Sequence, residues 1–203
     1  MSETNKYMMV GERLCLDFVN TISWRESEDK RRDWFTSYEK LVDWSYHAGI
    51  LEEKQAQLLL KKSIHDPSEA EQTLAQAIQL REVIYRIFRS FTKEELINPE
   101  DLTNFNKVIG HYYQLMHLVP VGNVFSMHFD IPEGAFDSML PPIVQSAVDI
   151  LTSEKDLKRV NQCEGDPCGW LFFDTSRNRS RRWCSMADCG NRAKARRFHQ
   201  NKK

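Results

Sequence analysis

Residues 163–192 read CEGDPCGWLFFDTSRNRSRRWCSMADCGNR and contain four of the five cysteines of a 203-residue chain. The cysteines form two pairs, Cys163-x4-Cys168 and Cys184-x4-Cys189, separated by fifteen residues. Four thiolates offered in two pairs suit tetrahedral zinc, which takes sulfur ligands at about 2.3 Å. Because four thiolates close the coordination shell, the spacing predicts one structural Zn2+ ion per chain and not a catalytic ion.

The part of the chain that carries these cysteines has little material for a hydrophobic core. From Asp156 onward, the large apolar side chains are mainly Trp170, Leu171, Phe172, Phe173, Trp183 and Phe198. Metal binding can supply on the order of 10 kcal/mol of folding free energy to such a segment. A β-hairpin within residues 169–183 and a helix within residues 190–200 predict a treble-clef-like zinc finger. Four free or buried cysteines are the alternative interpretation.

Basic residues are concentrated in the same region. Residues 177–203 hold ten Lys and Arg against one acid, a net charge of +9, so the first 176 residues carry −10 of the total of −1. Lys and Arg that contact phosphates release counterions, which favours nucleic-acid binding. The candidate nucleic-acid-binding residues are Arg177, Arg179, Arg181, Arg182, Arg192, Lys194, Arg196 and Arg197.

Other roles for this positive charge stay open. Some arginines can support the −2 charge of a tetrathiolate zinc site. The tail can also dock on an acidic protein partner or on the acidic N-terminal part, bind RNA, or form a solvated face.

The rest of the chain predicts an α+β, mainly helical fold. Helix-start patterns and apolar residues at helical spacing predict helices over residues 36–48, 51–63, 66–93, 98–109 and 143–151. Gly122-Asn123 between two apolar runs, residues 115–121 and 124–131, predicts a β-hairpin. We therefore expect a multihelical domain with a small antiparallel sheet over residues 1–154 and a zinc finger over residues 155–203.

Asp17 and Asn20 form the candidate site of the N-terminal domain, because polar side chains among apolar neighbours must find partners. They either hold a loop or helix end in place or bind a ligand. Cys15 is expected to be a buried apolar residue. The histidines lack metal-binding spacing, and neither a phosphate loop nor a nucleophile elbow is present. We therefore expect no catalytic residues and no enzymatic activity.

Composition points to a cytoplasmic protein without a membrane partner. The mean hydropathy is −0.57, and no apolar run approaches the roughly 18 residues of a membrane span. Residues 1–6 carry no signal-peptide pattern. Clustered cysteines in a reducing compartment favour metal over disulfides.

Residues 184–192, preceded by residues 169–176 and the Arg-rich residues 177–182, resemble the bacterial CGNR zinc finger. Residues 14–21, LCLDFVNT, are similar to the opening motif of the ABATE domain that usually precedes this finger. Together the two resemblances cover essentially the whole chain. They imply a stress-response transcription regulator whose finger binds DNA in preference to RNA.

An acidic helical domain joined to a basic finger is typical of a regulator. The N-terminal domain is thus a candidate sensor for a small-molecule effector or a dimerisation unit. Because a single finger reads few bases, we expect a homodimer.

Overall fold

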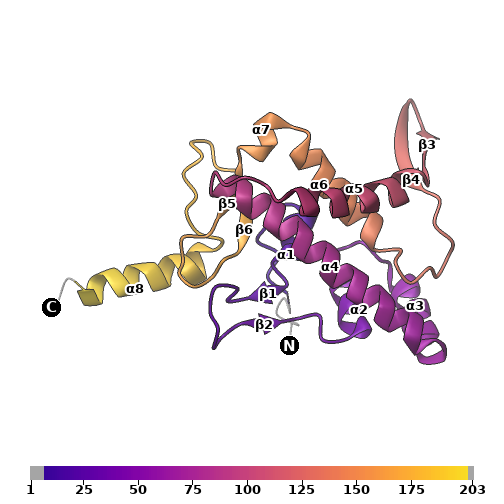
Figure 1. Ribbon diagram of the computed structural model, residues 1–203, viewed down its shortest axis with the longest axis horizontal. Helices are drawn as coiled ribbons and strands as arrows, with labels where there is room; N and C mark the ends of the chain where they lie inside the picture. Colours follow the sequence, from indigo (N-terminus) through magenta and orange to yellow (C-terminus); the bar gives the residue numbers. More distant parts are fainter. Residues whose placement is uncertain (1–6, 201–203) are drawn as a thin grey trace. The chain divides into compact units, whose positions relative to one another are not determined.

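The structure is a computed structural model in which residues 7–200 are described. Helices dominate, and the strands form three separate two-stranded antiparallel sheets (Figure 1). This arrangement confirms the predicted mainly helical α+β class. The expectation for residues 1–6, and the charges of Lys202 and Lys203, concern positions outside the described residues.

The chain forms two compact units that interleave along the sequence. One, here called the finger unit, contains the residues up to Trp34, Phe88–Leu96 and the residues from Ser146 onward. The other, the helical unit, contains Phe35–Ile87 and Ile97–Gln145. These compact units differ from the predicted division between residues 154 and 155, which stays a prediction. They differ because N-terminal residues bond directly to the zinc-finger segment, as described below.

The helical unit contains α2 (Tyr38–His47), α3 (Glu53–His65), α5 (Pro99–Tyr113) and parts of α4 (Pro67–Thr92) and α6 (Leu140–Leu151). Its core consists of side chains that are at most 2% exposed, among them Leu41, Trp44, Leu59, Ala77, Ile84, Phe105 and Ile143. They lie within helices that the sequence predicted.

Most helix boundaries agree with the local start signals. The Asp66 carboxylate accepts a hydrogen bond from the Glu69 N–H (3.1 Å), and the Asn98 side chain accepts one from the Glu100 N–H (2.9 Å). The sequence of Thr36 and Glu39 predicts a capping box, which is wrong, because α2 begins after Ser37. A capping box does form at α3, between Glu52 and Gln55.

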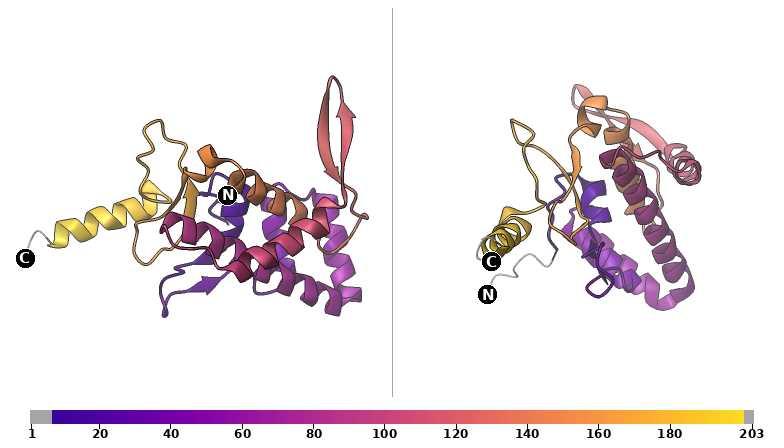
Figure 2. Two further views of the ribbon diagram at one scale, coloured as in Figure 1. Left: turned by 45° about the horizontal axis from the view of Figure 1, so that its top comes forward. Right: turned by 60° about the vertical axis from the view of Figure 1, so that its left-hand side comes forward.

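A β-hairpin of β3 (Met116–Val121) and β4 (Val124–Phe129) closes on the two-residue turn Gly122-Asn123. Gly122 has φ +61°, a value that favours glycine at this turn. His117 lies directly opposite His128. Figure 2 shows that the hairpin projects beyond the helices of its unit.

The finger unit contains α1 (Leu14–Val19), β1 (Ile22–Ser23), β2 (Arg32–Asp33), α7 (Glu154–Leu157), β5 (Val160–Gln162), β6 (Leu171–Phe173), η1 (Met186–Gly190) and α8 (Asn191–Gln200). β5 pairs with β6, with Val160 opposite Phe173. The predicted hairpin within residues 169–183 is therefore misplaced, since residues 174–183 form no strand. Here the buried Asp174 carboxylate accepts the N–H groups of Ser176 (2.8 Å) and Arg181 (3.0 Å) and turns the chain away from the sheet.

Across residues 7–200, the helices lack the combination of length and apolarity that a bilayer crossing requires.

Candidate metal centre and nucleic-acid surface

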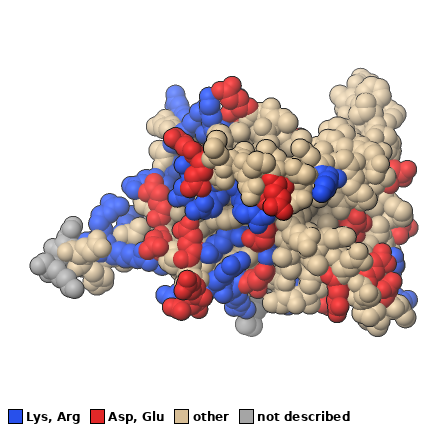
Figure 3. Space-filling view, viewed as in Figure 1, with Lys and Arg blue, Asp and Glu red and all other residues tan. Residues whose placement is uncertain are grey.

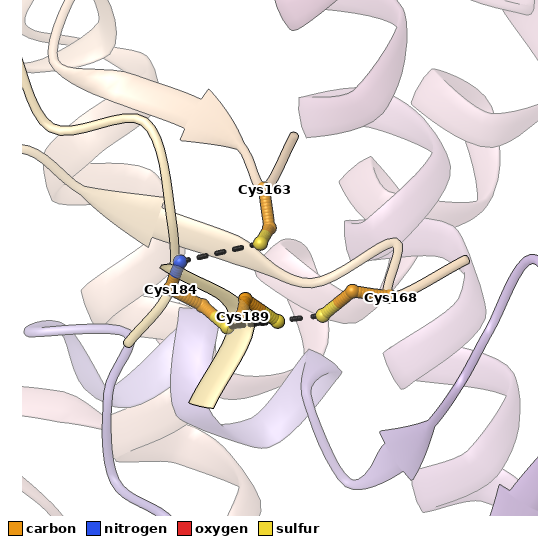
Figure 4. Close-up of side chains that lie close together, drawn as sticks. All are labelled: Cys163, Cys168, Cys184 and Cys189. Atoms are coloured by element: carbon orange, nitrogen blue, oxygen red, sulfur yellow. Dashed lines mark hydrogen bonds between the residues drawn. The ribbon is translucent and has the colours of Figure 1, made fainter. Parts of the chain in front are cut away.

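Two segments bring the four clustered cysteines together. Cys163 follows β5 and Cys168 lies three residues before β6, so the first pair occupies the tip of this hairpin. Cys184 precedes η1, a π-helical turn that contains Cys189. All four side chains are buried, and their Sγ atoms lie within 4.8 Å of one another. Figure 4 shows the sulfur atoms of both pairs converging on one point.

The sulfur positions fit a tetrahedral zinc ion. The Cys184 Sγ lies 3.7 Å from the Cys168 Sγ and 3.5 Å from the Cys189 Sγ. Zinc–sulfur bonds of about 2.3 Å in a tetrahedron require neighbouring sulfurs about 3.8 Å apart. The Cys163 Sγ also accepts the backbone N–H groups of Cys184 (3.3 Å) and Gly165 (3.4 Å), which stabilise a thiolate.

The ionisation of the thiols shows why this arrangement needs a cation. Interaction with Cys163, together with burial, raises the pKa values of Cys168 and Cys184. Hydrogen bonding with Cys168, Cys184 and Cys189 lowers the pKa of Cys163. Without a cation the cluster can therefore ionise only in part. A bound Zn2+ removes this conflict, because its charge offsets that of four thiolates.

Gly165 allows the hairpin tip to approach the second cysteine pair. A Cβ on Gly165 would lie 2.8 Å from the Cys189 Cβ, 2.9 Å from the Cys189 Sγ and 3.3 Å from the Cys163 Sγ. Only a residue without a side chain fits this space. Gly165 thus belongs to the metal centre although it offers no ligand.

We expect Gly165→Ala to weaken zinc binding by roughly tenfold or more, since overpacking of this kind costs about 1–3 kcal/mol. Competition with a chromophoric chelator measures the affinity. Gly110→Ala is the matched control, because a Cβ there meets no atom within 4 Å. Equal zinc affinities for the two variants would contradict the role of Gly165.

N-terminal residues complete the finger. The Asn20 side chain pairs with the backbone of Leu171, donating to its carbonyl (2.7 Å) and accepting from its N–H (2.9 Å). In this way it occupies the open edge of β6. The Trp170 indole N–H donates to the Ile22 carbonyl (2.6 Å), and the Arg25 N–H donates to the Cys168 carbonyl (3.1 Å). The metal-binding segment thus shares its hydrogen bonds with the start of the chain.

Asp17 positions the strand-like segment in front of α1. Its carboxylate accepts the N–H of Gly11 (2.8 Å), and the Gly11 carbonyl accepts the N–H of Phe173 (2.9 Å). Asp17 and Asn20 both bond to backbone partners, which agrees with the supporting role of the two roles that the sequence left open. Cys15 is fully buried, as expected, and burial raises its pKa to about 12.

Burial raises the pKa of Asp17 to about 6, although the N–H of Gly11 opposes this shift. Folding therefore favours the protonated carboxyl of Asp17 over the ionised one. The stability that this protonated group allows is lost as the pH rises from about 4 through 6. We expect Asp17→Asn, which keeps an acceptor for Gly11, to increase the free energy of unfolding by up to about 3 kcal/mol at pH 7.5. The gain should be about 1 kcal/mol smaller at pH 5.5. Urea unfolding at both pH values measures it, and a gain that is independent of pH would contradict the assignment.

Arg181 links the N-terminal segment to the zinc site. Its guanidinium donates to the carbonyls of Val10 (2.8 Å), Cys184 (2.6 Å), Trp183 (3.1 Å) and Phe173 (3.3 Å). It also lies 4.4 Å from the centre of the Phe172 ring. With these partners, Arg181 supports the fold and is not available for a phosphate.

Comparison with known families gives the context of this centre. Residues 12–154 match the ABATE family, described as "Putative stress-induced transcription regulator". The chain belongs to the ABATE family. Residues 159–202 match the CGNR zinc finger, and the four-cysteine cluster suits one structural zinc ion. A search of curated proteins found no match.

The CGNR motif of this ABATE-family chain supports the metal centre with its own side chains. The Arg192 guanidinium donates to the Cys189 Sγ (2.9 Å), pairs with Asp188 and lies 4.3 Å from the centre of the Trp24 ring. A Cβ on Gly190 would lie 2.8 Å from the sulfur of Met186, so Gly190 leaves room for that side chain. Arg192 therefore serves the thiolate cluster, the alternative role that the sequence left open.

The remaining predicted nucleic-acid residues fall into two groups. Arg182 donates to both oxygens of Glu164 (2.9 and 2.8 Å), and Arg196 donates to the Asp166 carbonyl (2.7 Å). Within residues 7–200, four others are exposed and form no ion pair in the structure: Arg177, Arg179, Lys194 and Arg197. These four are here called the free basic set. Figure 3 shows Lys and Arg over α8, with acidic residues near the base of the helix.

Sequence reasoning missed several residues of the centre. Trp24 and Gly165 carry no ligand atom, and Asp174 acts only through backbone N–H groups, so ligand spacing could not reveal them. The signal that was available for Gly165 is its position between two cysteines with only four residues between them.

Proposed function

We propose that the protein is a cytoplasmic DNA-binding transcription regulator of the stress response, with α8 and residues 175–180 as its DNA-binding surface. One observation carries this proposal. α8 runs for ten residues, and none of them is buried, whereas its first turn is held at the zinc site by Arg192. A basic helix without a buried residue is fixed at its base by the zinc site and leaves most of its surface accessible. This is the form in which zinc modules present a helix to the major groove.

The free basic set supplies the charge for phosphate contacts. Lys194 and Arg197 lie three residues apart on α8, so they share a face. Arg177 and Arg179 belong to the loop that follows β6. With no acid paired to them, all four side chains can neutralise phosphates.

The aromatic side chains of the finger favour duplex DNA over single-stranded RNA as the ligand. Trp170, Phe172 and Phe173 are buried, while Phe198 is the large aromatic side chain that α8 exposes. Single-stranded RNA is typically bound by several exposed aromatic rings on which bases stack. RNA binding is the outcome that competition experiments must exclude.

Selection from a random DNA pool by the zinc-loaded full chain tests this proposal. We expect one enriched sequence and an affinity that falls with salt, with a slope of about −3 to −4 for four phosphate contacts. A competing RNA pool should bind more weakly. Sequence-independent binding, or no binding with one zinc ion per chain present, would contradict the proposal.

We further propose the helical unit as a sensor without catalytic residues. A cleft of about 720 Å³ lies between α4 and α5. Apolar Val83 and Val108 line it together with polar Lys107, Tyr112 and Asp137. This mixture suits a small amphipathic effector. A thermal-shift screen of small molecules in which no compound raises the melting temperature would count against a sensor.

A further inference from the structure

Two histidines face each other across the β3–β4 hairpin. His117 of β3 lies directly opposite His128 of β4, and their ring centres are 6.4 Å apart with the ring planes inclined by 37°. Residues directly opposite in an antiparallel pair have Cβ atoms about 4.5–5.5 Å apart, so both side chains leave the sheet on the same face. Their spacing along the chain matches no metal-binding motif. It is therefore the strand register that brings the two imidazoles together.

Both imidazoles are available to a ligand. The two residues are exposed, on a hairpin that projects from the helices of its unit (Figures 1 and 2). Among residues 7–200, no group forms a hydrogen bond or an ion pair with either ring. By contrast, the Nδ1 atom of His47 lies 2.7 Å from the Asp43 carbonyl oxygen. A neutral imidazole offers a nitrogen lone pair and is the commonest metal ligand in proteins.

The charge around the histidine pair favours a cation. Residues 116–129 contain no Lys or Arg, so no positive side chain of the hairpin repels a metal ion. The Asp130 N–H donates to the Leu115 carbonyl (2.8 Å), which extends the ladder by one pair beyond the strand ends. Since side chains alternate between the two faces, Asp130 lies on the same face as His128. Its exposed carboxylate adds negative charge to this face.

The separation of the two rings suits one shared ion. A zinc–nitrogen bond of about 2.0–2.1 Å places the ion about 3.2 Å from a ring centre, so two imidazoles on one tetrahedral ion have centres about 5 Å apart. The observed separation is 6.4 Å. A rotation of about 15° about χ1 of each exposed side chain removes the difference and stays within one rotamer well.

We propose that His117 and His128 form a second metal site, which binds an exchangeable divalent ion of the zinc, nickel and copper class. Imidazole nitrogen suits these ions, whereas Mg2+ and Ca2+ take oxygen ligands. Two protein ligands leave coordination positions for water, unlike the four buried thiolates. The ion is therefore held weakly and is removed by dialysis, which leaves the zinc of the cysteine centre in place. This site requires neither DNA nor an effector.

Titration calorimetry of the dialysed, zinc-loaded full chain with Zn2+ tests the site. The wild-type chain should bind one additional ion, and the same titration with Mg2+ should show no binding. His117→Gln and His128→Gln should each weaken this second event at least about tenfold, the lower limit for removal of a group that supports a metal ligand. His65→Gln is the matched control, because it removes an exposed imidazole at the end of α3 and should leave the second event unchanged.

The histidine ring resonances give a second readout that needs no variant. In a chain labelled with 15N at histidine, Zn2+ should shift the ring nitrogens of His117 and His128 and leave those of His65 in place. A wild-type chain that takes up no additional zinc at about 100 μM free ion would overturn the proposal. So would a second event that survives either hairpin substitution, an equal loss in His65→Gln, or shifts confined to one of the two rings or to other histidines.

Discussion

Cys184→Ser should release most of the zinc and unfold the finger unit. The Cys184 Sγ lies 3.7 Å from the Cys168 Sγ and 3.5 Å from the Cys189 Sγ, close to the separation of two sulfurs that share a zinc ion. The backbone N–H of Cys184 also donates to the Cys163 Sγ. Loss of one thiolate leaves an open coordination shell and removes a large share of the roughly 10 kcal/mol that zinc contributes to folding. Metal analysis after dialysis should find well under one zinc ion per chain.

Tryptophan fluorescence can follow the same variant. Trp24, Trp34, Trp170 and Trp183 lie in the finger unit, and Trp44 in the helical unit. Most of the emission should therefore shift to longer wavelength, whereas circular dichroism retains the signal of α2, α3 and α5, which lie wholly in the helical unit. Cys15→Ala is the control, since it removes a buried thiol that is not a ligand. Full zinc content and unchanged protease resistance in Cys184→Ser would refute the metal site.

Replacement of the free basic set by glutamine should lower DNA affinity by roughly 10²–10³-fold near physiological salt and reduce the salt slope by about 3–4. Zinc content should stay at one ion per chain, because Arg177, Arg179, Lys194 and Arg197 are exposed and lie outside the four-cysteine cluster. Fluorescence anisotropy with the selected DNA across a salt series measures both quantities.

A matched variant separates local contacts from total charge. Lys40, Lys54, Lys61 and Lys107 are exposed residues of the helical unit, so their replacement by glutamine removes the same charge away from the finger. That variant should keep most of its DNA affinity. Equal losses in the two variants would mean that overall charge, and not α8 and its neighbouring loop, governs binding.

The arginines show why composition alone overstates a binding surface. Eight basic residues were candidates for nucleic-acid binding, and their positions in the sequence do not distinguish between them. In the structure Arg181 is surrounded by carbonyl groups, Arg192 supports a thiolate, and Arg182 and Arg196 bind acidic residues of the hairpin tip. Half of the candidates are thereby assigned to structure, which leaves a smaller and testable set.

The sequence by itself determined the features that depend on residues close together in the chain. Two cysteine pairs at short spacing define the candidate ligands, because four thiolates complete a tetrahedral zinc site. Asp66 and Asn98 mark the starts of helices, because the side chain of each accepts a hydrogen bond from a backbone N–H a few residues away. The Gly122-Asn123 turn sets the hairpin register, because Gly122 adopts the positive φ that a two-residue turn requires.

Only the tertiary structure decided which distant groups meet. Asn20 pairs with Leu171 and Trp170 with Ile22, each across roughly 150 residues, so the finger includes the start of the chain. No spacing rule reports such contacts, because they arise when buried polar groups must satisfy one another wherever the fold brings them. The same applies to the hairpin: its apolar residues were evident in the sequence, but only the fold leaves them in solvent.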